Sequence, residues 1–439
     1  MFDILKNRTY RHLFLAQIVA LVGTGLATVA LGLLAFDLAG EGAGLILGGI
    51  FTIKMIAYVG IAPVAGAFAD RVPRRAMLIA LDLIRAGVAL VLPFVTEAWQ
   101  VFGLIFILQG ASAAFTPTFQ ATIPDILPDE GEYTRALSLS RLASDLENII
   151  TPTLAGLALL VLSYNNLFWG TFAGFVISAA LVASVVLPAP KRGEPRGIYD
   201  RTTRGSRLYL ATPRLRGLLA LNLAGAAAGA MVLVNTVVLV RGTLGMDESA
   251  LAMTMFGFGL GSMIGAFALP KLLERFSDRP VMFWGAGFMI GANMALAAVI
   301  ASVGLTWSLL FAAWGLSGLG FAMVMTPSGR LLTRSSHAED RPAVFAAHFA
   351  LSHACWLIAY PLAGWSMTQF GAIGALMGLS GLGGVGMMIA LRVWPKHDPE
   401  MVPHAHPELP RDHPHLKEHA NGGHAFIIDD LHPAWARSS

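Results

Sequence analysis

Long apolar runs dominate this chain of 439 residues and limit the folds that it can adopt. A membrane-crossing α-helix needs about 20 consecutive, mostly apolar residues, and twelve such runs follow one another along the chain. Charged residues make up only 13% of the sequence, whereas a soluble globular protein carries about 25%. Continuous rather than alternating runs also exclude an outer-membrane barrel. The sequence therefore predicts an all-α polytopic membrane protein with twelve transmembrane helices.

Basic residues predict how these helices are oriented. The runs lie near 13–38, 44–69, 76–95, 99–120, 136–162, 164–187, 217–240, 249–272, 281–303, 305–327, 342–366 and 371–394. Lysine and arginine concentrate in the N-terminal segment, after the second and tenth runs and at 188–216, whereas the opposite loops contain only Arg241. An excess of Lys and Arg marks cytoplasmic loops. We therefore expect both termini in the cytoplasm and the protein in a bacterial-type inner (plasma) membrane.

Short motifs recur at a nearly constant spacing. Asp70-Arg71 follows the second run, and Asp278-Arg279 follows the eighth, 208 residues later. Such repeats indicate two parallel six-helix halves related by an axis along the membrane normal. The predicted parts are an N-terminal half at 1–187, a cytoplasmic basic linker at 188–216, a C-terminal half at 217–394 and a disordered histidine-rich cytoplasmic tail at 395–439.

The loop after the second run carries the most specific motif. It contains Gly66, three residues, Asp70-Arg71, two residues and then Arg74-Arg75. This pattern resembles the signature loop of the major facilitator superfamily, although Pro73 replaces the usual glycine, and the resemblance covers about 5–395. It implies a twelve-helix transporter without a cofactor or enzymatic activity, in which the loop forms a conformational latch. The expected latch residues are Gly66, Asp70, Arg71, Arg74, Arg75, Asp82 and Arg85.

A second motif indicates a branch within that superfamily. The segment from Thr151 to Gly156 is similar to the antiporter motif Gly-Pro-x-x-x-Gly of drug and siderophore exporters. Pro152 and Gly156 match this motif, whereas Thr151 replaces its first glycine. Many proton-coupled drug antiporters of this superfamily carry an arginine in the fourth helix, and this chain has none between Val101 and Phe119. Their usual proton-coupling arrangement is therefore not transferred to this chain.

Ionisable residues inside the fifth predicted helix are candidates for the transport site. A charge in the middle of a transmembrane helix costs about 2.5–3.5 kcal/mol on insertion scales, so it usually faces a partner or a cavity. Arg141 and Asp145 are four residues apart and can form a structural pair on one helix face. Glu147 lies on a different face, because successive residues turn by about 100°. Glu147 is therefore the candidate for a titrating carboxylate.

Lys54 and His353 are the other candidates inside the predicted helices. Lys54 lies well inside the second run, where it would neutralise Glu147, bind an anionic substrate or hold the two halves together as part of a structural pair. His353 lies in the eleventh run. A histidine at that place either lines the transport path as a proton carrier or is a structural residue with its hydrogen bonds satisfied.

The tail beyond residue 395 is rich in histidine. Spaced imidazoles suit weak binding of Ni²⁺, Co²⁺ or Zn²⁺, and the composition resembles that of tails in nickel-resistance exporters of the same superfamily. The alternative is a tail without a role in transport. Apolar residues within Ala425–Trp435 indicate a short docking segment. The candidate metal ligands are His404, His406, His413, His415, His419 and His424.

Together these features predict a secondary active transporter that exports a small solute in exchange for protons. The nucleotide-binding pattern GxxxxGK[ST] is absent, so ATP is not its direct energy source. The tail slightly favours a divalent metal such as Ni²⁺ or Co²⁺, and the exporter-like motif favours an amphipathic organic molecule such as a drug or siderophore. A non-transporting membrane sensor and a membrane enzyme are remote alternatives. The expected partners are the substrate, protons and the lipid bilayer, with no nucleic acid, and we expect a monomer.

Overall fold

The computed structural model describes residues 2–68, 73–129, 132, 136, 139–140, 143, 151, 154–187, 198–337, 340–396, 401–403, 423–425, 427–428, 432 and 435. Nine stretches of these residues are long and apolar enough to cross a membrane. Two of them, Arg8–Ile61 and Ala343–Val393, have 54 and 51 residues, about twice the length of one crossing. Each turns back at a glycine with positive φ, Gly40 at 53° and Gly371 at 65°.

The described residues therefore supply eleven crossings, and the predicted all-α polytopic membrane fold is confirmed. The remaining predicted run, at 136–162, lies mostly outside the described residues. A glycine suits both turns, because residues with a side chain rarely adopt positive φ. This explains how two helical crossings follow each other with almost no loop between them.

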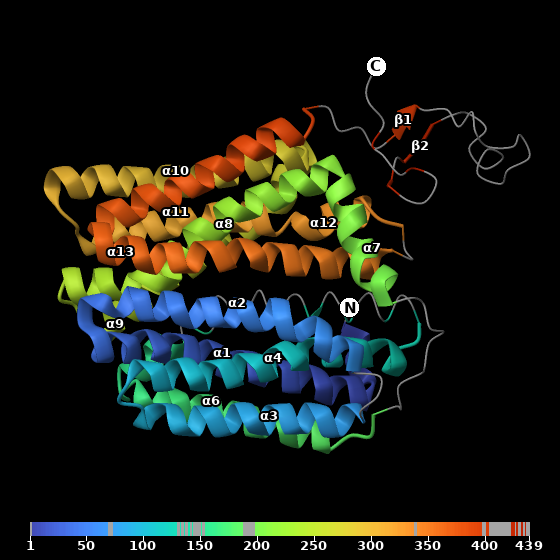
Figure 1. Cartoon of the computed structure of the whole chain (residues 1–439), viewed down its shortest axis with the longest axis horizontal. Helices are drawn as coiled ribbons and strands as arrows, with labels where there is room; N and C mark the ends of the chain where they lie inside the picture. The colour runs from blue at the N-terminus through green and yellow to red at the C-terminus, as the bar shows by residue number, and fades with distance from the viewer. Residues whose placement is uncertain are drawn as a thin grey trace, which may run out of the picture.

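The first group of helices is drawn from blue to green in Figure 1. It contains η1 (Phe2–Lys6), α1 (Arg8–Ala39), η2 (Gly40–Gly42), α2 (Ala43–Phe68), α3 (Arg74–Val91), η3 (Leu92–Phe94), α4 (Ala98–Ile126) and α6 (Asn165–Ala183). Within this group α1 packs on α6, α2 packs on α4, and α3 packs on both α4 and α6. Helices α1, α2, α4 and α6 are apolar on nearly every face, as expected for helices that contact either lipid or each other, whereas α3 has a polar side.

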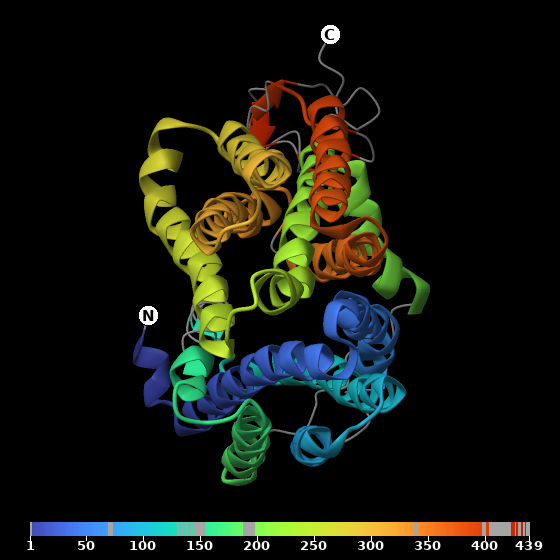
Figure 2. The same cartoon turned by 90° about the vertical axis from the view of Figure 1, so that its left-hand side faces the viewer.

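The second group lies beside the first and contacts it mainly through α2 and α13, as Figures 1 and 2 show. It contains α7 (Ile198–Ala211), α8 (Pro213–Val237), the π-helical η4 (Val238–Thr243), α9 (Glu248–Arg275), α10 (Asp278–Val303), α11 (Trp307–Met325), α12 (Ser328–Arg334) and α13 (Arg341–Val393). Here α8 packs on α13, α9 packs on α11, and α10 packs on both α11 and α13.

The two ends of this bundle carry different elements of the chain. The terminal end, on the right in Figure 1, carries the N terminus, α7 and α12. The far end, on the left, carries η2, η4 and the turn between α10 and α11.

Helix α7 attaches the basic linker to the second group at the terminal end. The Arg204 guanidinium donates to both carboxylate oxygens of Asp340, at 2.6 and 3.2 Å. The Tyr209 hydroxyl lies 3.0 Å from His348 Nδ1 on α13. Gly205 permits the close approach, because a Cβ there would lie 2.0 Å from the Ala343 carbonyl oxygen.

A few residues of the histidine-rich tail are described in the structure. Strands β1 (Met401–Pro403) and β2 (Gly423–Ala425) pair in antiparallel fashion. Ile428 is buried, and the Arg214 guanidinium at the start of α8 lies 4.8 Å from the ring centroid of Trp435. Apolar and aromatic side chains near the chain's end therefore find partners at the terminal end of the bundle, which composition alone does not reveal.

Asp247 provides a test of helix capping at the far end. Its carboxylate accepts hydrogen bonds from the Ala250 backbone N–H and the Ser249 hydroxyl, both at 2.9 Å. The Ala250 N–H, followed by the Ser249 hydroxyl, lowers the pKa of Asp247 below its usual 3.8. The cap therefore stabilises α9 above about pH 3.8 and is lost as pH falls through the lowered pKa.

We expect Asp247→Ala to lower the free energy of unfolding by about 1 kcal/mol at pH 7. Asp247→Asn should keep most of the stability, because asparagine is an equally good N-cap. Denaturation in mixed micelles at pH 7 and pH 3 measures both effects. The assignment of the cap to the carboxylate would be contradicted if wild type and Asp247→Ala differed in free energy of unfolding by the same amount at both pH values.

Candidate functional site

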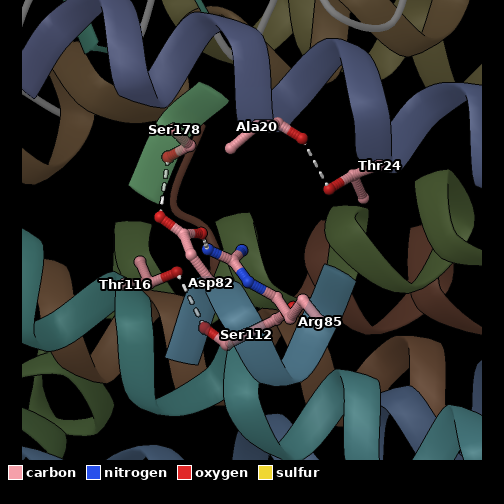
Figure 3. A network of polar contacts seen from close by, with 7 residues as sticks. All are labelled: Ala20, Thr24, Asp82, Arg85, Ser112, Thr116 and Ser178. Carbon is pink, nitrogen blue, oxygen red and sulfur yellow. Dashed lines mark hydrogen bonds and ion pairs between the residues drawn. The ribbon is translucent and has the colours of Figure 1, made fainter. Parts of the chain in front are cut away.

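Described ionisable groups inside the helices form two clusters, one within the first group and one between the two groups. The first cluster joins α3 to α6 and α4, and Figure 3 shows it at close range. The Asp82 carboxylate accepts hydrogen bonds from the Arg85 guanidinium and from the Ser178 hydroxyl, the latter at 2.8 Å. Asp82 is 0% exposed and Arg85 is 4% exposed.

Two aromatic rings complete the surroundings of Arg85. Its guanidinium lies 4.3 Å from the ring centroid of Phe115 on α4 and 4.5 Å from that of Phe175 on α6. Such cation–π contacts are strongest where the cation is removed from water. The sequence assigns Asp82 and Arg85 to the latch, whereas in the structure they bind each other deeper along α3. This pair therefore holds three helices of one group together.

The described residues that were predicted to form the latch, other than Asp82 and Arg85, lie at the terminal end. Arg74, at the start of α3, forms an ion pair with Asp125 near the end of α4. The Arg75 guanidinium donates to the Ala183 carbonyl at the end of α6. Gly66 lies near the end of α2, and Asp70 and Arg71 lie outside the described residues. Sequence reasoning did not select Asp125 as the partner of Arg74.

The repeat contains a signal for Asp125. In the second group Asp278, at the start of α10, lies 3.4 Å from Arg330 and 3.7 Å from Arg334 on α12. Arg334 follows Asp125 by 209 residues, one more than the 208 residues between Asp70 and Asp278. An acidic residue in the first group and a basic residue in the second therefore lie at nearly equivalent positions, and comparing the two halves in this way points to Asp125.

The second cluster lies between the groups and contains Lys54, Tyr58, Phe349 and His353, which we call the interface cluster. Tyr58 on α2 stacks on His353 of α13 with a centroid distance of 5.5 Å and an interplanar angle of 3°. The Phe349 ring lies 4.0 Å from the His353 ring and 5.9 Å from the Tyr58 ring. The Lys54 ammonium lies 5.9 Å from the centroid of Tyr58.

The depth of this cluster follows from helix geometry. Lys54 comes eleven residues after Ala43, the first residue of α2, which is about 16 Å along the helix axis. That is close to the middle of a hydrocarbon core about 30 Å thick. Sequence reasoning singled out Lys54 and His353 separately, and the structure brings them together around Tyr58.

The hydrogen bond of His353 determines which ring nitrogen carries the hydrogen when the imidazole is neutral. Its Nδ1 lies 2.6 Å from the Phe349 carbonyl oxygen. Because a carbonyl only accepts, Nδ1 carries the hydrogen, and Nε2 is the basic nitrogen of the neutral ring. Nε2 is therefore the ring nitrogen that remains available to accept a hydrogen bond.

A row of aromatic rings continues from the interface cluster into the second group. Phe51 on α2 stacks on Tyr360 at 4.8 Å, and Tyr360 lies 5.1 Å from Trp356, both on α13. Trp356 lies 6.3 Å from Phe321 on α11, which lies 5.6 Å from Phe258 on α9. We call these five residues the aromatic row. Sequence reasoning did not select them, although the positions 349, 353, 356 and 360 have the spacing of one helix face.

Small residues bring the two groups into close contact between the interface cluster and the far end. A Cβ at Gly364 would lie 2.4 Å from the Gly44 carbonyl oxygen, and one at Gly48 would lie 2.8 Å from the Tyr360 carbonyl oxygen. Gly156, of the antiporter-like motif, is also near the second group, since a Cβ there would lie 2.9 Å from the Ala252 Cβ. Pro152 of that motif lies outside the described residues.

Several predicted site residues have no described position. These are Arg141, Asp145, Glu147, His404, His406, His413, His415 and His419. His424 belongs to β2. Among the described residues, no group of three or more His, Cys, Asp or Glu side chains is placed to hold a metal ion.

Comparisons with known proteins agree with this architecture. The family model of the Major Facilitator Superfamily matches residues 13–216 and again 217–421. The chain is 25% identical over 275 residues to macrolide efflux protein A of Streptococcus pyogenes, a match that covers 60% of this chain and 66% of that protein, slightly less than two thirds of its length. It is 24% identical over 389 residues to the uncharacterized MFS-type transporter YvqJ of Bacillus subtilis, covering 84% of this chain and 88% of that protein.

Solved structures show the same fold. A mutant form of the nucleoside transporter NupG superposes with a TM-score of 0.69 at 15% identity, covering 88% of this chain and 100% of that one. A bacterial homologue of the human lysosomal transporter Spinster, in an inward-facing and occupied conformation, gives a TM-score of 0.66 at 12% identity, covering 88% and 96%. The chain belongs to the major facilitator superfamily, and its relatives include proteins named for macrolide efflux and for multidrug resistance.

Proposed function

We propose that this transporter exports amphipathic organic molecules in exchange for protons and binds them at the interface cluster. The observation that carries the proposal is the stacking of Tyr58 on His353 across the two groups, with Lys54 beside it. A transporter of this family moves its substrate by changing the contacts between its halves. A site made from both halves near mid-membrane therefore couples binding to that movement.

The chemistry of the interface cluster suits an organic molecule better than a bare metal ion. The Lys54 ammonium has no lone pair with which to coordinate a metal ion, and its N–H groups donate to hydroxyl, carbonyl or carboxylate oxygens. Tyr58, Phe349 and the aromatic row offer flat apolar faces that bind rings and aliphatic surface. The efflux relative in Streptococcus pyogenes is named for macrolides, which combine large apolar surfaces with many oxygen atoms.

His353 is the proposed proton carrier among the described residues. Its Nε2 is the basic nitrogen, and its Nδ1 hydrogen bond to Phe349 holds the ring against Tyr58. Gain or loss of a proton at Nε2 changes the charge at the contact between the halves. Glu147 is proposed as a second proton-binding group and Lys54 as its counter-charge. Arg141 and Asp145 are proposed as a pair beside it.

The terminal end of the bundle has a proposed orientation, a proposed latch and the histidine-rich tail. We place the terminal end in the cytoplasm and the protein in a bacterial-type inner membrane as a monomer, since the basic residues gather at that end. The latch there combines Arg74 and Asp125 with Asp70 and Arg71. The tail histidines remain a proposed weak metal site with no part in the transport path.

Inverted membrane vesicles test this function. We expect uptake of a labelled macrolide or of an aromatic carboxylate when a proton gradient is imposed, and loss of uptake when an uncoupler removes the gradient. Vesicles without the protein are the control. Gradient-driven uptake of Ni²⁺ or Co²⁺ with no uptake of either organic probe would contradict the proposal and favour the metal as substrate.

A further inference from the structure

Arg241 is the one basic residue in the loops of the far end, and the function proposed above gives it no role. Lys and Arg concentrate in the loops of the terminal end, so an arginine in the loops of the far end is unusual. It lies in η4, a π-helical segment at Val238–Thr243. Such segments are rare and occur often at functional sites, because the wider turn redirects side chains.

The contacts of Arg241 cross from the second group to the first. Its guanidinium lies 5.5 Å from the ring centroid of Phe36, near the end of α1. The backbone next to Arg241 also lies close to the first group, because a Cβ at Gly242 would lie 3.6 Å from the Phe36 ring. Arg241 also lies 4.0 Å from the Glu248 carboxylate at the start of α9. One side chain thus touches the first group and an acidic residue of the second.

Further acidic groups surround this contact. The Tyr164 hydroxyl donates to the Asp37 carboxylate at 2.6 Å. Burial, the hydrogen bond to Asp37 and the charges of Asp37 and Glu248 raise the pKa of Tyr164, so Tyr164 stays protonated. Glu41 lies beside Gly242, and Asp247 precedes Glu248. Opening the far end would separate Arg241 from Phe36 and leave the acidic groups of the two sides with less positive charge between them.

We propose that Arg241 is the residue that holds the far end closed, by bridging Phe36 of the first group and Glu248 of the second. Closing the far end brings the guanidinium onto the Phe36 ring of the first group while it stays beside Glu248 of the second. This role rests on the movement of two halves in a major facilitator protein and not on the identity of the substrate.

Cysteine labelling measures this closure directly. The single native cysteine, Cys355, is replaced by alanine, and Val238→Cys serves as the reporter. Val238 is buried, and a Cβ at Gly44 on α2 would lie 3.7 Å from it, so it lies in the contact between groups. A hydrophilic maleimide is added to the full-length protein in nanodiscs without substrate.

Arg241→Gln should raise the labelling rate of Val238→Cys roughly threefold to tenfold, as expected from the loss of one cation–π contact and one partly exposed ion pair. Arg241→Lys should have a smaller effect, because lysine keeps the charge and loses the planar stacking. Arg275→Gln, the same charge change at the exposed end of α9, is the matched control and should change nothing.

A second reporter separates closure from folding. Leu221→Cys lies buried inside the second group, away from η4, and its labelling should not respond to Arg241→Gln. Unchanged labelling of Val238→Cys in the Arg241→Gln protein would overturn the proposal, as would an equal rise at both reporters. Because no substrate is present, failure of the organic-solute proposal would leave this result unaffected.

Discussion

Replacing Asp82 by asparagine is expected to lower the free energy of unfolding by about 3–5 kcal/mol. The substitution keeps a group that can bind the Ser178 hydroxyl but leaves the Arg85 guanidinium, 4% exposed, without its ion partner. A buried charge that loses its partner keeps the full cost of desolvation. Phe115 and Phe175 contact the guanidinium in both proteins, so their cation–π interactions do not replace the lost carboxylate.

The double variant Asp82→Leu with Arg85→Leu distinguishes this explanation from simple loss of packing. Removing both charges removes the cost, so we expect the double variant to be more stable than Asp82→Asn alone. The matched control is Asp3→Asn, which breaks the exposed Lys6–Asp3 pair and should have no measurable effect. Denaturation in mixed micelles measures all four proteins. A double variant less stable than the single one would contradict the account.

Gly364→Leu is expected to abolish transport. Even a Cβ at this position would lie 2.4 Å from the Gly44 carbonyl oxygen, and backbone atoms cannot move aside as a flexible side chain can. The contact between α2 and α13 therefore cannot form, and the cycle cannot return to the state with the far end closed. The larger leucine side chain makes the block complete.

Gly378→Leu is the matched control for this block. Gly378 lies on the same element beyond the Gly371 turn, and a Cβ there meets nothing within 4 Å. We expect wild-type transport of a labelled macrolide in proteoliposomes for this control. We also expect Gly364→Leu protein to purify as a folded monomer with its far end open to labelling. Transport by Gly364→Leu at the wild-type rate would show that the contact is not required.

The fold was predictable because its signal is local. Each apolar run carries its own evidence of a crossing, and the helices α3, α9 and α10 begin and end close to the predicted runs. The same holds for the turn at Gly371, which lies where two runs meet. In contrast, α7 and the paired strands β1 and β2 lie in segments where composition indicated only a basic linker and a disordered tail.

The site was predictable only in part. Lys54 and His353 were recognisable because a charge or an imidazole inside a transmembrane helix is costly. Their proximity was not, because Tyr58 and His353 are far apart in the sequence and meet only when α2 packs on α13. Asp82 and Arg85 were assigned to the latch, and their buried pairing with each other and with Ser178 depends on how α3 packs on α6, which the sequence does not reveal.

Binding of a labelled macrolide to purified protein tests the central claim, that the interface cluster holds the substrate. We predict that Lys54→Gln and His353→Asn each weaken binding at least about tenfold, a loss of about 1.4 kcal/mol, with folding retained. His337→Gln, at an exposed position before α13, is the control and should bind like the wild type. Wild-type affinity in both interface-cluster variants would contradict the claim and place the substrate elsewhere.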